Sequence, residues 1–192
     1  MQPLEQDQQI LYDPHFYSCV EATRLYARLR EELEWRQDQI QIYGRSVSIP
    51  RLQAFIAEPG LQYTYSGLTL EGVGFPAVLA AIQIAISQRL GVHFNAVLAN
   101  LYRDGSDTMG WHSDDEAELG PDPIIASLTL GAERSLKFRP KGGGNSWGIE
   151  LQHGSLLLMG SGVQDRWQHS VPKRARCRDG RINLTFRQII AH

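Results

Sequence analysis

The chain has 192 residues, 42% hydrophobic and 21% charged, with a formal net charge of −2. These values fit one soluble globular domain, and the charge provides no overall field that attracts nucleic acid or membrane. The longest apolar run, residues 77–86, is too short to cross a bilayer. Two cysteines, Cys19 and Cys177, favour a reducing compartment over a disulfide scaffold.

The N-terminal part of the chain predicts a polar arm and two helices. Residues 1–14 are polar, lack the apolar core of a signal peptide, and are expected to form the arm. In residues 18–35, Ser18 and Glu21 form a capping box ahead of apolar side chains at near-helical spacing. Residues 76–91 predict the second helix, because proline begins the segment and glycine ends it.

From about residue 93 the pattern changes to short runs of strand character. These runs are separated by turn-rich segments such as "GGGN". They read "NAVLANLY", "IIASLTL", "SLKFR", "IELQ", "SLLLMG" and "INLTFRQII". The sequence therefore predicts one α+β, mainly β domain: an antiparallel sandwich or barrel with helices near its N-terminus.

The stretch "GWHSDDE" (110–116) suggests part of a metal site. His112 and Asp114 are two residues apart, so on a strand they point the same way. A third ligand is needed, and the candidates are His153 and His169. Two histidines and one carboxylate form the facial triad that leaves one side of an iron ion open. The alternative is a hydrated acidic loop.

The strand "RINLTFR" alternates strictly between polar and apolar residues. Arg181, Asn183, Thr185 and Arg187 share one face. An edge strand with that face in water is one interpretation. If the strand instead lines a barrel, its two arginines need anionic partners, and a dicarboxylate cosubstrate fits the bidentate guanidinium group.

Four motifs in chain order resemble the AlkB family of iron(II)- and 2-oxoglutarate-dependent dioxygenases, especially its nucleic-acid repair members. They are "NLY" (100–102), "HSD" (112–114), "WQHSVP" (167–172) and "RINLTFR" (181–187). The likeness extends from about residue 39 to 190. It implies a single domain over 1–192 with a double-stranded β-helix (jelly-roll) core at about 93–190. It also implies a nucleotide-recognition lid at about 39–75.

The resemblance also implies the ligands. Iron(II) is expected to bind His112, Asp114 and His169, which leaves His153 as a turn residue. Arg181 is expected to pair with the distal carboxylate of 2-oxoglutarate and Arg187 to lie nearer the metal. The full set implied for the cosubstrate is Asn100, Tyr102, Arg181, Asn183, Thr185 and Arg187.

The implied reaction uses O₂ and 2-oxoglutarate to remove N-methyl groups from 1-methyladenine and 3-methylcytosine. It releases formaldehyde, succinate and CO₂. Both lesions are cationic, so an acid near the iron would favour them, and Asp115 is the candidate. The alternative for Asp115 is an ordinary exposed loop acid.

Reaching a methyl group on a Watson–Crick edge requires an extruded or unpaired base. Tyr63 and Tyr65 share a strand face and are expected to stack on that base. The resemblance places Tyr43, at a hairpin tip, where duplex-repairing relatives carry an aromatic wedge. Ordinary strand aromatics are the alternative for all three. Basic runs at 134–141 and 173–181, with Arg45 and Arg51 near the wedge, predict one basic side for the phosphate backbone.

The expected partner is alkylated DNA, single or double stranded, with RNA left open. The alternatives are a related dioxygenase acting on tRNA or protein, a zinc hydrolase with two histidines and one aspartate, and an inactive nucleic-acid-binding module. A monomer without membrane contact is expected, in the cytoplasm, or in the nucleus of a eukaryote.

Overall fold

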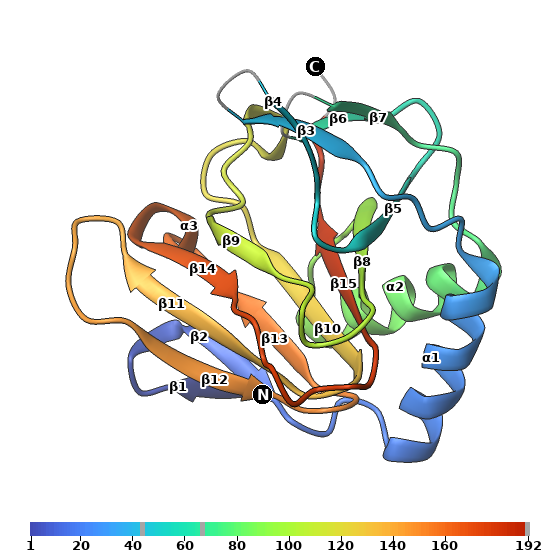
Figure 1. The fold of residues 1–192 in the computed structure, drawn as a ribbon. Coiled ribbons are helices and arrows are strands. Elements are labelled where there is room, and N and C mark those ends of the chain that lie inside the picture. Colours follow the sequence, from blue (N-terminus) through green and yellow to red (C-terminus); the bar gives the residue numbers. More distant parts are fainter. Residues whose placement is uncertain (43–44, 66–67, 191–192) are drawn as a thin grey trace.

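The computed structural model describes residues 1–42, 45–65 and 68–190 (Figure 1). Its centre is a seven-stranded antiparallel sheet, in which strands far apart in the sequence are neighbours. The strands in spatial order are β1 (Gln2–Leu4), β2 (Asp7–Asp13), β13 (Leu156–Met159), β10 (Ile125–Gly131), β15 (Arg181–Arg187), β8 (Ala96–Tyr102) and β5 (Leu52–Ala57).

A four-stranded antiparallel sheet packs against part of the first (Figure 1). Its order is β12 (Trp147–Leu151), β11 (Arg134–Pro140), β14 (Trp167–Val171) and β9 (Met109–His112). Phe138 and Leu151 from this sheet join Leu157 and Met159 of β13 in one buried apolar cluster. The two layers form the jelly-roll sandwich that the sequence predicts, with the site between them.

Both predicted helices are present, although the first ends at Glu32, three residues before the predicted end at residue 35. Helix α1 (Cys19–Glu32) has the capping box, with the Ser18 hydroxyl accepting from the main-chain N–H of Glu21. Helix α2 (Ala77–Leu90) follows Pro76 and ends at Gly91, whose φ of 68° suits glycine. Both cover one face of the large sheet, through the buried cluster that includes Leu29 and Ile82 (Figure 1). The short helices are η1 (Ala117–Leu119) and α3 (Val163–Arg166).

Two small antiparallel hairpins lie at one end of the sandwich (Figure 1). One pairs β3 (Gln39–Ile42) with β4 (Arg45–Ser48), and the other pairs β6 (Gln62–Tyr65) with β7 (Leu68–Glu71). They fall within the predicted lid. Tyr43, the expected wedge, lies outside the described residues.

The prediction of a polar N-terminal arm is wrong. Strand β2 pairs with β13, with Tyr12 opposite Leu157, and Ile10 is fully buried. The polar composition of residues 1–14 did not indicate β2, because Ile10 is the one fully buried side chain of this strand. The predicted boundary between lid and core also changes, because β5, at 52–57, pairs with β8 as an edge strand of the large sheet. None of the described helices is long and apolar enough to cross a membrane.

Candidate metal and cosubstrate site

The metal site forms where β9 and β14 pair. His112 ends β9 and lies opposite His169 in the antiparallel register, and Asp114 follows two residues later. The candidate ligand atoms of these three side chains all lie within 4.8 Å of one another. His153 is elsewhere, in the turn after β12, where its Nδ1 accepts a hydrogen bond from the main-chain N–H of Gly131 at 2.9 Å.

Local contacts prepare these side chains to bind a cation. The Nδ1–H of His112 donates to the Gly110 carbonyl at 2.9 Å, which leaves Nε2 as the atom with a free electron pair. Burial, followed by neighbouring His169, lowers the pKa of His112 to about 4, so its imidazole is neutral. Burial disfavours the charged form of Asp114, but Arg187 and His169 nevertheless hold the pKa of that carboxyl well below its usual range.

The donor set fits iron(II). Asp114 Oδ2 lies 3.5 Å from His169 Nε2, a suitable separation for two atoms that face one ion. Two imidazoles and one carboxylate form the facial set of iron(II) oxygenases. The main-chain N–H of Asp114 donates to Gln164 Oε1 at 2.9 Å, which holds the loop carrying this carboxylate.

The residues implied for 2-oxoglutarate lie on β8 and β15, two neighbouring strands of the large sheet. Tyr102 is opposite Arg181, and Asn100 is opposite Asn183. All six side chains are buried and line the same cavity as the metal trio: Asn100, Tyr102, Arg181, Asn183, Thr185 and Arg187. The alternation of β15 therefore faces the interior of the sandwich, and the alternative of a polar face in water is wrong.

Arg181 is the strongest sign of an anionic ligand. It is 1% exposed, and its Nη2 donates to Thr129 Oγ1 at 2.9 Å. Its Nε and Nη1 are buried without a hydrogen-bond partner among the described residues. Burial lowers the pKa of Arg181 to about 10, although Tyr102 gives the charge some support. A carboxylate fits this vacant edge of the guanidinium group.

Arg187 serves the metal ligands directly. Its Nη2 forms a buried ion pair with Asp114 Oδ1. Its Nε has no hydrogen-bond partner within the described part of the chain, so one donor remains for a second anion. Arg187 thus lies at the metal end of the cavity, and Arg181 is the second arginine that lines it.

Of the expected base-binding residues, only Tyr63 is seen at the site. Its ring is buried, stacks on Phe55 at 5.5 Å between centroids, and lies 5.5 Å from the Arg187 guanidinium carbon. Tyr65 belongs to β6, but its side chain is outside the description. Asp115 is exposed and bonds the Lys141 ammonium group at 2.8 Å, as the alternative of a loop acid predicts.

Glu116 is the acid that faces the site, and the sequence interpretation missed it. Its side chain is half-buried and lies beside Tyr63. Burial, together with the charge of Asp114, raises the pKa of this carboxyl. The sequence carries no clear signal for it, because residues 113–116 follow the end of β9 and strand alternation does not extend into a loop.

Two members of the expected basic side are interior residues instead. Arg134 is 1% exposed and donates to the carbonyls of Asp104, Asp107 and Pro172. Arg51 is also buried, and its Nε donates to Asn100 Oδ1 at 2.7 Å. Both side chains therefore support the walls of the site and are not available to phosphates.

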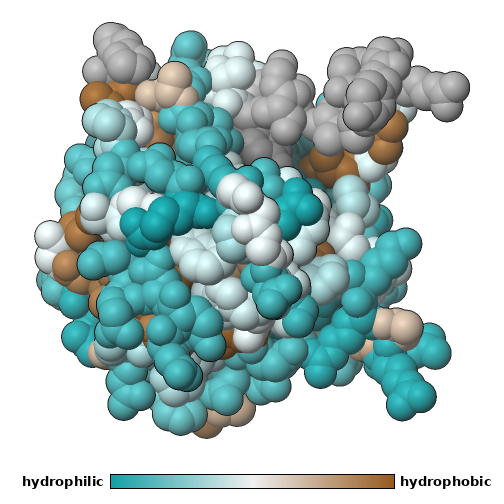
Figure 2. Space-filling model, turned by 90° about the vertical axis from the view of Figure 1, so that its left-hand side faces the viewer, coloured by the Kyte–Doolittle hydropathy of each residue, from teal (hydrophilic) through white to brown (hydrophobic). Residues whose placement is uncertain are grey.

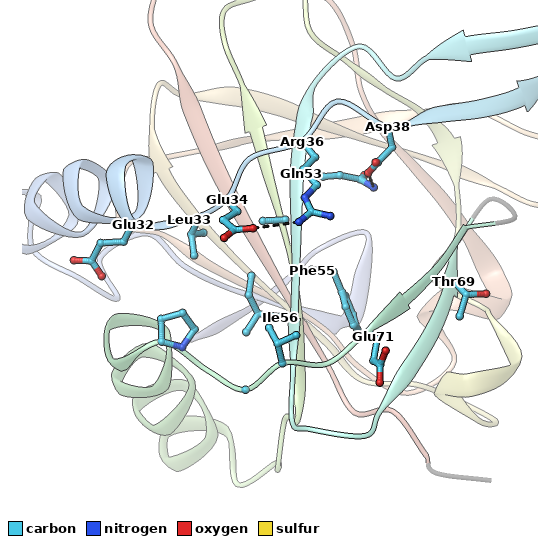
Figure 3. Close-up of a pocket in the computed structure, with 14 residues that line it drawn as sticks. Glu32, Leu33, Glu34, Arg36, Asp38, Gln53, Phe55, Ile56, Thr69 and Glu71 are labelled. Atoms are coloured by element: carbon cyan, nitrogen blue, oxygen red, sulfur yellow. Dashed lines mark hydrogen bonds and ion pairs between the residues drawn. The ribbon is translucent and has the colours of Figure 1, made fainter.

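A separate cavity of about 490 Å³ lies along the outer edge of β5 (Figure 3). Its rim carries more carboxylates than cations: Glu32, Glu34, Asp38 and Glu71 against Arg36. Arg36 is itself paired with Glu34 at 3.1 Å. This balance does not suit a dicarboxylate, whereas the smaller cavity between the sheets is lined by Arg181 and Arg187.

Comparison with known proteins gives the family. A family model described as "2OG-Fe(II) oxygenase superfamily" matches residues 9–187. The chain is 39% identical to mouse DNA oxidative demethylase ALKBH2 over 188 residues, covering 91% of this chain and 77% of the mouse protein. It is 40% identical to human DNA oxidative demethylase ALKBH2 over 185 residues, which cover 91% of this chain and 71% of the human protein.

Two further matches agree. The chain is 39% identical over 186 residues to bovine alpha-ketoglutarate-dependent dioxygenase alkB homolog 3, with 92% of this chain and 64% of the bovine protein covered. The solved structure of OsALKBH1 superposes with a TM-score of 0.66 at 16% identity, over 98% of this chain and 99% of that one, which shows a shared fold. Sequence, fold and site together place the chain in the AlkB family of 2OG-Fe(II) oxygenases.

Proposed function

We propose that this protein is an oxidative demethylase that repairs 1-methyladenine and 3-methylcytosine in DNA, with RNA as a second substrate class. Relatives with about 40% identity over most of the chain are named DNA oxidative demethylases, which supports a nucleic-acid substrate. The observation that carries the proposal is a single cavity lined by both the His112–Asp114–His169 trio and the unsatisfied guanidinium group of Arg181.

In this proposal His112, Asp114 and His169 hold iron(II). The bound iron, with O₂ and 2-oxoglutarate, supplies the oxidation that turns an N-methyl group into a hydroxymethyl group, which leaves as formaldehyde beside succinate and CO₂. The protein's contribution is to position these groups and exclude water. The hydrogen bonds to Gly110 and Gln164 keep the ligands oriented.

The cosubstrate pocket is built from β8 and β15. Arg181 takes the distal carboxylate on its vacant edge, and Arg187 lies at the metal end. Asn183 is held by its bond to Ser127 Oγ at 2.8 Å, and Thr185 donates to Asn183 Oδ1 at 3.1 Å. Asn100 and Tyr102 complete the wall from the neighbouring strand. A buried dianion thereby compensates two buried cations.

The lesion base is recognised by charge and stacking. Glu116, which lies beside Tyr63, offers a carboxylate to a cationic base in a setting where burial strengthens the attraction. As the sequence predicts, we assign base stacking to Tyr63 and Tyr65 and the duplex wedge to Tyr43; of these side chains only Tyr63 is described, and its buried ring backs the base pocket from beside Arg187. Asp115, held by Lys141 at the surface, contributes at longer range. The protein works as a monomer in the compartment that holds the DNA, which is the cytoplasm of a bacterium or the nucleus of a eukaryote.

The alternatives are less well supported. A zinc hydrolase has no use for a buried guanidinium group awaiting a dicarboxylate, and membership of the oxygenase family argues against it. An inactive binding module has no need of a complete ligand set. The family alone does not distinguish DNA from tRNA or protein, so the substrate is the point to test.

The test is anaerobic reconstitution with iron(II), followed by O₂, 2-oxoglutarate and oligonucleotides carrying 1-methyladenine or 3-methylcytosine. Restored bases and equimolar formaldehyde, both dependent on 2-oxoglutarate, are expected. His93→Ala is a matched control, since His93 is exposed and its ion-pair partner, at 3.5 Å, is the exposed Glu58 rather than a residue of the site. Succinate without base recovery on every oligonucleotide, but with recovery on a peptide or tRNA, would overturn the DNA assignment.

A further inference from the structure

We propose that Trp111, backed by Arg139, is a stacking platform for an unpaired nucleobase that flanks the alkylated base on the same strand. The inference rests on the proposed function, which supplies the nucleic-acid substrate. It adds a second binding position, outside the cavity, on the outer face of the four-stranded sheet.

The platform follows from alternation along three neighbouring strands. On β9, β14 and β11, the residues His112, His169 and Phe138 point into the sandwich, where the ring centroids of Phe138 and His169 are 6.0 Å apart. The residue next to each one therefore points outward. These outward residues are Trp111, Gln168 and Arg139.

The three outward side chains hold one another in place. The guanidinium carbon of Arg139 lies 4.6 Å from the centroid of the Trp111 ring, a cation–π contact that covers one face of the indole. Arg139 Nε donates to Gln168 Oε1 at 2.9 Å, which fixes the guanidinium group above the ring. The indole is therefore held flat against a support and is not a free surface side chain.

Part of the Trp111 side chain is open to solvent. Trp111 is 37% exposed, whereas Trp147 and Trp167 pack against Phe138 and against each other. Tryptophan is enriched at binding surfaces, and a ring already held in one orientation loses little conformational entropy when a partner binds. A nucleobase is the complementary occupant, because every base has a π face that can stack on an aromatic ring.

The charges near Trp111 fit a nucleic-acid strand. Arg139 supplies one cation, and Lys141 lies just beyond the end of β11, bonded only weakly through an exposed pair with Asp115. Phosphates can compete for both cations. The face of the molecule in Figure 2, which is the left-hand side of Figure 1, is mainly hydrophilic.

The position relative to the metal defines which base stacks. Trp111 directly precedes the ligand His112, so their Cα atoms are about 3.8 Å apart and their side chains leave opposite faces of one strand. A nucleic-acid strand that places one base beside His112 therefore brings its neighbouring nucleotides close to the outer face of the four-stranded sheet. A base on Trp111 must leave its own helical stack, so the platform favours single-stranded substrate.

The test compares two short substrates that carry the same 3-methylcytosine. One has ordinary flanking bases and the other has abasic sites on both sides. For the wild-type enzyme, loss of the flanking bases should raise KM about tenfold, the value of one base–aromatic stack. In Trp111→Ala the two substrates should have KM values within about twofold, and Trp111→Phe should keep most of the difference.

A binding measurement separates this inference from the proposed function. Unmodified oligothymidine should quench the tryptophan fluorescence of the wild-type protein and of Trp35→Phe, but should do so much less in Trp111→Phe. Equal quenching in all three proteins, or an equal KM ratio in wild type and Trp111→Ala, would overturn the platform. Quenching through Trp111 without any demethylation would instead reject the proposed function and leave the platform standing.

Discussion

Replacing Arg181 by methionine should stabilise the protein while impairing cosubstrate binding. The guanidinium group is fully buried, is stacked 5.2 Å from the centroid of the Tyr102 ring, and shares that ring with Arg134 at 5.6 Å. No carboxylate among the described residues pairs with Arg181. Two buried like charges are therefore held against the same aromatic ring, and each raises the cost of burying the other.

The magnitude follows from two opposing contributions. Replacing buried charge by apolar atoms of similar volume commonly stabilises by about 1–4 kcal/mol. Loss of the hydrogen bond to Thr129 costs about 1 kcal/mol. The free energy of unfolding of cosubstrate-free Arg181→Met should therefore be higher by roughly 0–3 kcal/mol. Removing one partner of a buried charge pair costs about 2–5 kcal/mol of binding, so the Kd for 2-oxoglutarate should rise about 30-fold or more.

Thermal unfolding with and without 2-oxoglutarate, under anaerobic conditions with manganese(II) in place of iron, measures both effects. At a concentration one hundred times Kd, the wild-type protein gains about 2.7 kcal/mol. For a chain of this length that corresponds to roughly 5–11 °C in Tm. Arg181→Met should begin at an equal or higher Tm and rise little. Arg28→Met, which removes an exposed arginine paired with Glu32, is the matched control.

The reasoning about Arg181 would be refuted by one pattern in particular. If Arg181→Met unfolds several degrees below the wild type without cosubstrate, yet keeps the full rise with it, the guanidinium group is structural. In that case the carboxylate binds elsewhere in the cavity.

Three further predictions concern other parts of the molecule. His169→Ala should abolish turnover and leave the fold intact, as judged by circular dichroism, and retained 2-oxoglutarate-dependent demethylation would remove His169 from the metal site. Glu116→Gln should reduce kcat/KM about tenfold for cationic 3-methylcytosine but little for a neutral methylated base, because one buried charge pair is lost; equal losses would make Glu116 a packing residue. Ile10→Ala should lower the free energy of unfolding by about 2–5 kcal/mol, measured by urea denaturation, because β2 belongs to the core; a loss below about 0.5 kcal/mol would restore the view of residues 1–14 as an arm.

Local sequence patterns determined the helices, most strands and the chemistry of the site. The capping box at Ser18 and the proline and glycine around 76–91 specify α1 and α2 through contacts within a few residues. The alternation in 181–187 determined which side chains of β15 share a face. The order of motifs gave the family and the trio, since each motif keeps the residue types that the reaction needs.

Only the tertiary structure decided which side chains enter the cavity. Strand pairing joins residues far apart in the chain, so it made β2 a core strand and placed β5 beside β8. The path of the loop after His112 turned Glu116 inward and Asp115 outward, although both follow Asp114 closely. The sequence did not predict the burial of Arg51 and Arg134 either. An arginine in the sequence does not reveal whether carbonyl groups and side-chain acceptors will surround it in the fold. The sequence determines which side chains are available for the site, and packing between strands distant in the chain determines what surrounds each of them.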